Sequence, residues 1–289
     1  MSVFALMVAT FTAAAAAGVS AWELTVEAPA SLAAETARLR SVDREQLTRL
    51  LARADLEIPP VVHVTLMPDA DPRARSVPAW IVGRAFGARD IVIFPDRIAA
   101  YPFESLETVL SHELVHLALF VRAGGRPLPR WFHEGVAVSV EAEWEFRDSL
   151  RLFVAAAGTP MIADLSQLFA SDSRPDTTEA YLLAAALANY VRRRHGAAVP
   201  GAIAGHVARG VSFGRAFEMA TGESPDEAAK GAWATYRRWT AWLPFMTSES
   251  AIWAGILCLA FIAFAVRLAR RTRRRRKWDE EERRDEPPM

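Results

Sequence analysis

Five consecutive residues near the middle of the chain carry the side chains best suited to chemistry. His112-Glu113-Leu114-Val115-His116 is an HExxH motif. Because residues four apart lie on one face of a helix, the imidazoles of His112 and His116 can reach a single metal ion. Glu113 lies about 100° further round the helix than His112, close to the ion without binding it. This spacing predicts a Zn²⁺ site in which Glu113 is the general base for a zinc-bound water.

A second segment offers the third ligand that an open zinc site requires. Residues 131–137 read Trp-Phe-His-Glu-Gly-Val-Ala and place a carboxylate at Glu134, 18 positions after His116. Together the two segments resemble the gluzincins, the thermolysin-like peptidases and zinc aminopeptidases, in which a glutamate in a Trp-x-x-Glu-Gly-x-Ala context completes the site. The resemblance implies that Glu134 is the third zinc ligand and that the reaction is hydrolysis of a peptide bond. Metzincins are disfavoured, because Leu119 and Arg122 occupy positions where that group needs glycine and histidine.

The resemblance also implies where the substrate and the developing oxyanion are held. It is strongest over residues 81–141 and extends more loosely through the helical remainder. The predicted strand 90–94, just before the motif helix, resembles the edge strand on which gluzincins align peptide substrates. Gluzincins take an oxyanion donor from a downstream tyrosine or histidine, and Tyr181 is our first choice for that role, with His133 the second.

One position departs from the gluzincin pattern. Thermolysin-like enzymes have a carboxylate four residues after the glutamate ligand, where it orients a histidine, and this chain has Val138 there. Because a ligating imidazole normally donates its other N–H, another carboxylate should take this role. Glu107 and Glu141 are both candidates. The remaining histidines are isolated in the sequence and are expected to have structural or surface roles: His63, His195 and His206.

The spacing of apolar and turn-forming residues predicts the elements that position these side chains. Residues 105–122 are predicted to form the motif helix, and residues 130–141 the helix that carries Glu134. Further helices are expected at 31–54, 177–195, 202–208, 213–220 and 226–242, with a strand at 61–66 and a hairpin of 79–82 with 90–94. This order predicts an α+β, zincin-like domain with a small mixed sheet and a helical C-terminal part.

The N-terminal end of the chain is apolar in a way that predicts export. Residues 1–21 carry no charged side chain and end in Val19-Ser20-Ala21. The small residues fit a signal peptide that is cleaved before Trp22. An uncleaved signal anchor is the alternative.

The C-terminal end predicts a membrane anchor. Residues 250–266 are uncharged, and eight of the eleven residues in 267–277 are basic. This pairing predicts a transmembrane helix at 250–268 followed by a cytoplasmic tail at 269–289. A buried core helix with a solvated basic face is the alternative. The domain between the two ends, 22–245, is therefore expected outside the cytoplasm, on the periplasmic side in a bacterium.

Charge and cysteine content narrow the choice of partners. The formal net charge is zero, but ten basic and six acidic residues lie from Arg267 onward, which leaves 24 basic and 28 acidic residues before it. A mildly acidic outer domain gives no support for nucleic-acid binding, and the basic tail suits anionic lipid headgroups. The single cysteine, Cys258, lies in the predicted membrane segment, so the outer domain depends on its core rather than on disulfides.

The sequence therefore predicts a membrane-anchored, extracytoplasmic zinc metallopeptidase that acts on a peptide or protein substrate. The predicted metal ligands are His112, His116 and Glu134, and the predicted catalytic residues are Glu113 and Tyr181. The alternative from another class is a non-catalytic metal-binding sensor or interaction domain, which a fourth protein ligand would indicate. Hydrolysis of a substrate other than a peptide is a third hypothesis.

Overall fold

The computed structural model describes residues 22–98, 105–141, 160–171 and 174–240, together with 253, 256–257, 259–264 and 266–267. The chain divides into two compact units, residues 1–233 and 234–289, and each is described by itself. The predicted signal peptide (1–21), the tail (269–289) and much of the predicted membrane segment (250–268) lie outside the described residues. Within the described stretches, no helix is both long and apolar enough to cross a membrane.

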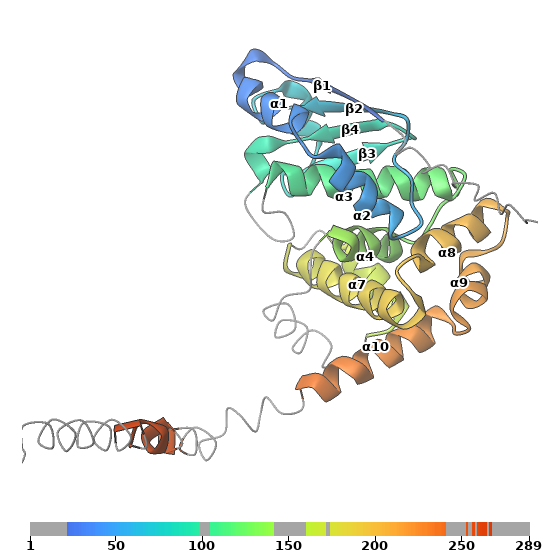
Figure 1. Cartoon of the computed structure of the whole chain (residues 1–289). Helices are drawn as coiled ribbons and strands as arrows, with labels where there is room; N and C mark the ends of the chain where they lie inside the picture. The colour runs from blue at the N-terminus through green and yellow to red at the C-terminus, as the bar shows by residue number, and fades with distance from the viewer. Residues whose placement is uncertain are drawn as a thin grey trace, which may run out of the picture. The chain divides into compact units, whose positions relative to one another are not determined.

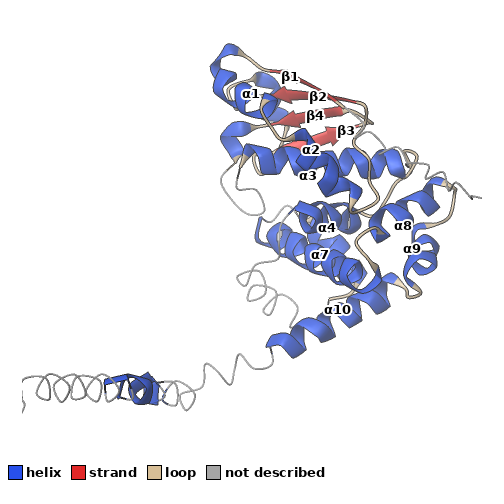
Figure 2. Ribbon diagram, viewed as in Figure 1, coloured by secondary structure: helices blue, strands red, loops and turns tan. Residues whose placement is uncertain are grey.

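A small mixed sheet forms one layer of the first unit, as predicted. Its four strands are β1 (Glu23–Glu27), β2 (Val61–Leu66), β3 (Gly83–Phe86) and β4 (Asp90–Ile93). They are hydrogen bonded in the order β1-β2-β4-β3, and β3 is the only antiparallel member of this described sheet (Figure 2). The alternating burial of β2 and β4 shows that one face of the sheet packs against the core.

The hairpin corrects two expectations about this sheet. Its first strand is Gly83–Phe86 rather than residues 79–82, because Gly83 belongs to the strand and does not end it. The predicted edge strand at 90–94 is internal, since β4 pairs with β2 on one side and β3 on the other. The edge strand of the described sheet next to the motif helix is therefore β3. The prediction was wrong because no residue pattern within the hairpin determines which of its strands pairs with β2.

The predicted helix at 31–54 is two helices. A short 3₁₀ turn, η1 (Ala30–Leu32), leads into α1 (Ala33–Arg40), and α2 (Arg44–Ala52) follows after a break. The break is caused by Asp43, whose carboxylate accepts a hydrogen bond from the Gln46 backbone N–H at 2.8 Å and so caps the second helix. Strand β1 precedes these helices and was not predicted, because only five residues carry its alternation.

The motif helix forms where it was predicted. Helix α3 (Leu106–Arg122) begins at Ser105, whose hydroxyl accepts a hydrogen bond from the Thr108 backbone N–H at 3.1 Å. It packs against the sheet beside β3, and Figure 1 shows α4 (Arg130–Glu141) and α7 (Arg174–His195) in the layers beyond it. The first unit is thus built as sheet, motif helix and helical layer, which is the α+β arrangement expected.

Helices α4 and α7 approach very closely. A Cβ atom placed on Gly135 of α4 would lie 2.3 Å from the backbone carbonyl oxygen of Ala184 on α7, so only glycine fits there. The glycine therefore sets the distance between the helix that carries Glu134 and the helix that carries Tyr181. The other described elements are η2 (Pro72–Ser76), η3 (Pro95–Arg97), α6 (Ile162–Ala170), α8 (Val199–Ala208), α9 (Phe213–Thr221) and α10 (Pro225–Thr240).

Candidate metal centre

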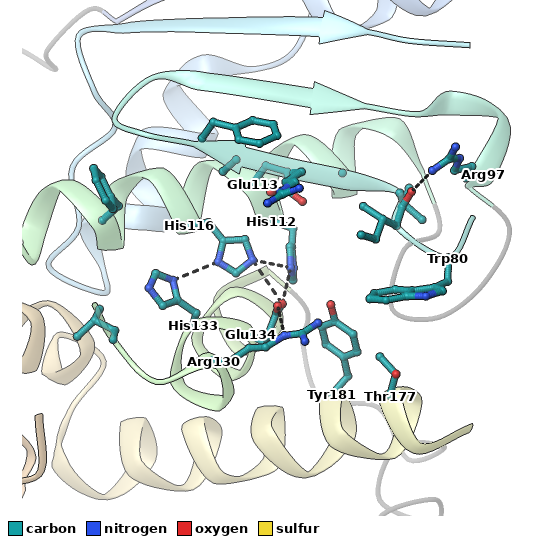
Figure 3. Close-up of a pocket in the computed structure, with 18 of the residues that line it drawn as sticks. Trp80, Arg97, His112, Glu113, His116, Arg130, His133, Glu134, Thr177 and Tyr181 are labelled. Carbon is teal, nitrogen blue, oxygen red and sulfur yellow. Dashed lines mark hydrogen bonds and ion pairs between the residues drawn. The ribbon is translucent and has the colours of Figure 1, made fainter. Parts of the chain in front are cut away.

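Three side chains predicted to bind metal converge on one point. The Nε2 atoms of His112 and His116 are 3.1 Å apart, and Oε2 of Glu134 is 3.3 Å from the first and 3.4 Å from the second (Figure 3). The two imidazoles come from consecutive turns of α3, and the carboxylate comes from α4. Their ligand atoms form a group that could hold a metal ion, as the sequence predicted.

The motif helix places the side chains of His112 and Glu113 in the core. His112 and Glu113 are only 1% and 3% exposed, whereas most groups of this kind are solvated in proteins. Apart from Val121, the leucine and valine side chains of α3 are buried, which holds the helix in one rotational orientation. The rigid packing of α3 therefore fixes the directions of the two imidazoles.

One carboxylate oxygen of Glu134 faces the two imidazoles, and the other faces the guanidinium of Arg130. Its Oε1 is 3.6 Å from Nε of Arg130, one turn earlier on α4, while Oε2 faces the imidazoles. Burial acts to raise the pKa of this carboxyl, but His116 and His112 beside it outweigh burial and hold the pKa well below its usual range. Glu134 is thus ionised, as a metal ligand must be.

Glu113 has a different electrostatic setting from Glu134. Burial and the nearby negative charge of Glu134 raise the pKa of Glu113 to about 7, although His116 and the backbone N–H of Ala85 act to lower it. Its carboxylate lies under β3, where a Cβ atom on Gly83 would come within 2.6 Å of Oε1. Glu113 therefore faces the cleft without joining the three ligand atoms, and its pKa is suited to exchanging a proton near neutral pH.

His133 lies behind His116 and outside the cluster of ligand atoms. The two Nδ1 atoms are 3.3 Å apart, so His133 faces the ring nitrogen of His116 that points away from Glu134. Burial and the nearby His116 together lower the pKa of His133 to about 4, although Glu134 acts to raise it. Because it lies outside the group of candidate ligand atoms, His133 is not positioned to be a fourth metal ligand.

Tyr181 reaches the same site from α7. In Figure 3 its ring rises toward Glu134 and Arg130, and its centroid lies 6.4 Å from that of His112. Burial and the adjacent Glu134 carboxylate raise the pKa of its hydroxyl well above 10, so the hydroxyl keeps its proton. The ring packs edge-on against Phe169 at 5.5 Å, which fixes its direction.

A cleft of about 780 Å³ contains all of these groups. The residues before β3 and β3 itself form one side, and α3, α4 and α7 form the rest. Trp80 and Thr177 line the end away from His133 (Figure 3).

The predicted carboxylate partner of a ligating histidine is not Glu107. Both carboxylate oxygens of Glu107 accept hydrogen bonds from Arg38, at 3.0 and 2.7 Å, outside the cleft. The side chain of Glu141 lies outside the described residues. Two of the histidines expected to be structural bind other groups: His195 contacts Glu223 at 2.9 Å and His206 contacts Arg209 at 2.9 Å.

Two contributors to the site were not anticipated from the sequence. Arg130 lies one helical turn before Glu134, and this i,i+4 spacing is the signal that could have identified it. Gly83 makes room for the Glu113 carboxylate, and no local pattern distinguishes this use of glycine from a strand break.

Comparison with known proteins adds nothing to these geometric findings. No protein family, no curated protein and no solved structure matches the chain significantly.

Proposed function

We propose that the protein is a zinc-dependent metallopeptidase. The observation that carries the proposal is the convergence of His112, His116 and Glu134 in a cleft that also contains the Glu113 carboxylate. Three protein ligands from an HExxH helix and the next helix are typical of catalytic rather than structural zinc sites. The position of His133 behind His116, away from the ligand atoms, agrees with an open coordination position.

The spacing of the three ligand atoms supports zinc as the ion. Zinc binds nitrogen and oxygen ligands at about 2.0–2.2 Å, so the donors of a tetrahedral site lie roughly 3.3–3.6 Å apart. The observed separations are 3.1, 3.3 and 3.4 Å. Two imidazole nitrogens and one carboxylate oxygen are also a ligand set that zinc prefers.

The chain's own residues supply the proton transfers and the orientation. Zinc, when bound, supplies Lewis acidity that polarises a carbonyl and lowers the pKa of water. Glu113 accepts the proton that the attacking water loses and passes it to the leaving amine, for which a pKa of about 7 is suited. Tyr181 keeps its hydroxyl proton and donates a hydrogen bond to the oxyanion that forms on the substrate carbonyl.

We also propose that this catalytic domain is anchored in a membrane and lies outside the cytoplasm. The uncharged segment 1–21, the uncharged segment 250–266 and the basic residues that follow it support this placement. Large apolar side chains among the described residues of 253–266 are exposed, which is typical of a surface that meets lipid or another protein. Phe261, for example, is 73% exposed.

Replacing Glu113 with Gln tests the proposed reaction. We expect Glu113→Gln to retain zinc, because Glu113 is not among the three ligands, and to lose about 10²- to 10⁴-fold in hydrolysis, because the general base is gone. Hydrolysis is measured on a quenched-fluorescent peptide library, and zinc by elemental analysis of the purified full-length chain.

The matched control is Glu107→Gln, which changes the same residue type on the same helix. Glu107 is bound to Arg38 outside the cleft, so this variant should hydrolyse peptides like the wild type. A Glu113→Gln variant as active as the wild type would contradict the mechanism. A wild type that holds zinc but cleaves no member of the library favours the non-catalytic metal-binding alternative.

A further inference from the structure

The two ring nitrogens of His116 face different groups. Its Nε2 faces the cluster, 3.1 Å from Nε2 of His112 and 3.4 Å from Oε2 of Glu134. Its Nδ1 faces away and lies 3.3 Å from Nδ1 of His133. The two rings are 5.4 Å apart between centroids and tilted by 43°, so the contact is made by the nitrogens at the ring edges rather than by stacking.

A metal ion on His116 would determine which of the two Nδ1 atoms in this contact carries a proton. A neutral imidazole carries one proton, and a metal ion on Nε2 takes the lone pair of that atom, which leaves the proton on Nδ1. His116 Nδ1–H is then a donor, and the group 3.3 Å away must accept. The acceptor is Nδ1 of His133, whose own proton is therefore on Nε2.

His133 is held in the place that this role requires. It lies in the first turn of α4, where its backbone N–H donates to the Pro129 carbonyl at 3.1 Å. Trp131 and Phe132, beside it in the sequence, are buried and fix that turn against the core. His133 and the ligand Glu134 therefore move as parts of one rigid helix start.

The carboxylate with which thermolysin-like enzymes orient a histidine is absent at the matching position of this chain. The corresponding position is Val138, and Glu107 is bound to Arg38 elsewhere. We propose that His133 is a positioning residue that accepts the Nδ1 proton of His116 and so holds the Nε2 lone pair of His116 toward the metal. This role rests on the proposed metal site. It concerns the orientation of the His116 imidazole and not the hydrolytic step.

Two nearly isosteric substitutions test the role of His133. Asn places an acceptor oxygen near the position of the histidine Nδ1, and Leu has the same shape without an acceptor. We expect His133→Leu to weaken zinc binding about 10- to 100-fold, as loss of such a partner typically does, and His133→Asn to restore most of it. Zinc affinity is measured on the purified full-length chain by competition with a chromophoric chelator.

His206→Leu is the matched control, because it removes a histidine that contacts Arg209 outside the cleft and should leave zinc affinity unchanged. Equal zinc affinity in His133→Leu and the wild type would overturn the role of His133 alone. Equal weakening by Leu and Asn would also overturn it, since shape rather than the acceptor would then be responsible. A wild type that binds no zinc would overturn the metal site and this role together.

A measurement on the wild type keeps the proposal falsifiable if the variants fold poorly. In the zinc-loaded chain with ¹⁵N-labelled histidine, nuclear magnetic resonance reports which ring nitrogens carry protons. We expect a proton on Nδ1 of His116 and none on Nδ1 of His133. The reverse assignment would overturn the proposal, whatever the variants do.

Discussion

Two walls of the candidate site each contain a glycine at a close contact, but one glycine faces a proposed catalytic side chain and the other faces a helix backbone. We call β3 against α3, with Gly83 facing Glu113, the strand wall, and α4 against α7, with Gly135 facing Ala184, the helix wall. A Cβ at Gly83 would lie 2.6 Å from Oε1 of Glu113, which is the movable end of a side chain. A Cβ at Gly135 would lie 2.3 Å from a backbone carbonyl oxygen, which cannot move without its helix.

The difference shows that similar sequence features can serve chemistry in one wall and the fold in the other. A disturbance of the strand wall changes the setting of the proposed general base, while the helices stay packed. A disturbance of the helix wall separates two helices, and with them Glu134 and Tyr181.

The helix wall should be the more sensitive to an added methyl group. Gly135→Ala forces α4 and α7 apart, and because core overpacking costs about 1–3 kcal/mol and occasionally more, we expect a loss above about 3 kcal/mol in the free energy of unfolding. Urea unfolding followed by circular dichroism measures it. The control is Gly214→Ala in α9, where a Cβ meets nothing within 4 Å and the free energy should stay equal or rise. Equal effects of the two substitutions would contradict the close approach.

The strand wall should make stability depend on pH in the metal-free chain. The folded pKa of Glu113, about 7, is above its unfolded value of 4.5, so the folded chain binds this proton more tightly. That stabilisation is full below pH 4.5 and is lost as pH rises through about 7. As pH rises over this interval, the free energy of unfolding of Glu113→Gln should therefore increase relative to that of the wild type. The increase is up to about 3 kcal/mol, at about 1.4 kcal/mol per pKa unit.

The comparison with Glu113→Gln isolates this carboxyl, because the low pKa of His133 acts on stability in the opposite direction in both proteins. Urea unfolding in the presence of a chelator, at several values of pH between 4.5 and 8, gives the difference. A difference that does not change with pH would show that Glu113 titrates normally.

On the helix wall, the Tyr181 hydroxyl should matter for turnover and little for folding. Tyr181→Phe keeps the ring against Phe169 and removes the oxyanion donor, so kcat should fall about 10²-fold with little change in zinc content. Tyr190→Phe, on the same helix but outside the cleft, is the control. The measurement is steady-state kinetics on the library peptide that the wild type cleaves fastest. An unchanged kcat in Tyr181→Phe would show that Tyr181 only packs against its neighbours.

Gly83→Ala should change activity with a smaller loss of stability than Gly135→Ala. The new methyl displaces the Glu113 carboxylate and presses on the buried Val109 side chain at 2.9 Å, and a displacement of about 1 Å in a catalytic group lowers the rate by up to about 10²-fold. We expect a 10-fold or larger fall in kcat, retained zinc, and a loss of about 1–3 kcal/mol in the free energy of unfolding. A large loss of stability with unaltered kcat would reverse the proposed division between the walls.

The motif helix and the cluster of candidate metal ligands could be predicted because their signals are local. Ser105 caps α3, apolar residues recur at helical spacing, and His112 and His116 are one turn apart, so the helix start and the metal face follow from short-range rules. The same rules could have excluded Glu107. It lies nine residues before His116, which is about 180° round the helix, and the structure indeed places its carboxylate on Arg38.

Strand order and the surroundings of the ligands could not be predicted because they are set by distant parts of the chain. Which strand of the β3–β4 hairpin is at the edge depends on β2 pairing with β4, and no residue in the hairpin encodes that choice. The predicted strand 79–82 stops short of Gly83, because the residue that Gly83 makes room for, Glu113, is thirty residues away in the sequence. The contact between His133 and His116 likewise depends on how α4 packs on α3.

Burial along α3 has a consequence for how long the site persists. Eleven of the 17 residues of this helix are buried, and its last turn is tied by Arg122 to Asp55 at 2.6 Å. A segment with this many apolar contacts opens with a free energy near that of global unfolding, whereas exposed segments open far more often. The two imidazoles therefore lie on a helix that opens only when much of the unit unfolds, so the cluster should persist through the local openings of more exposed segments.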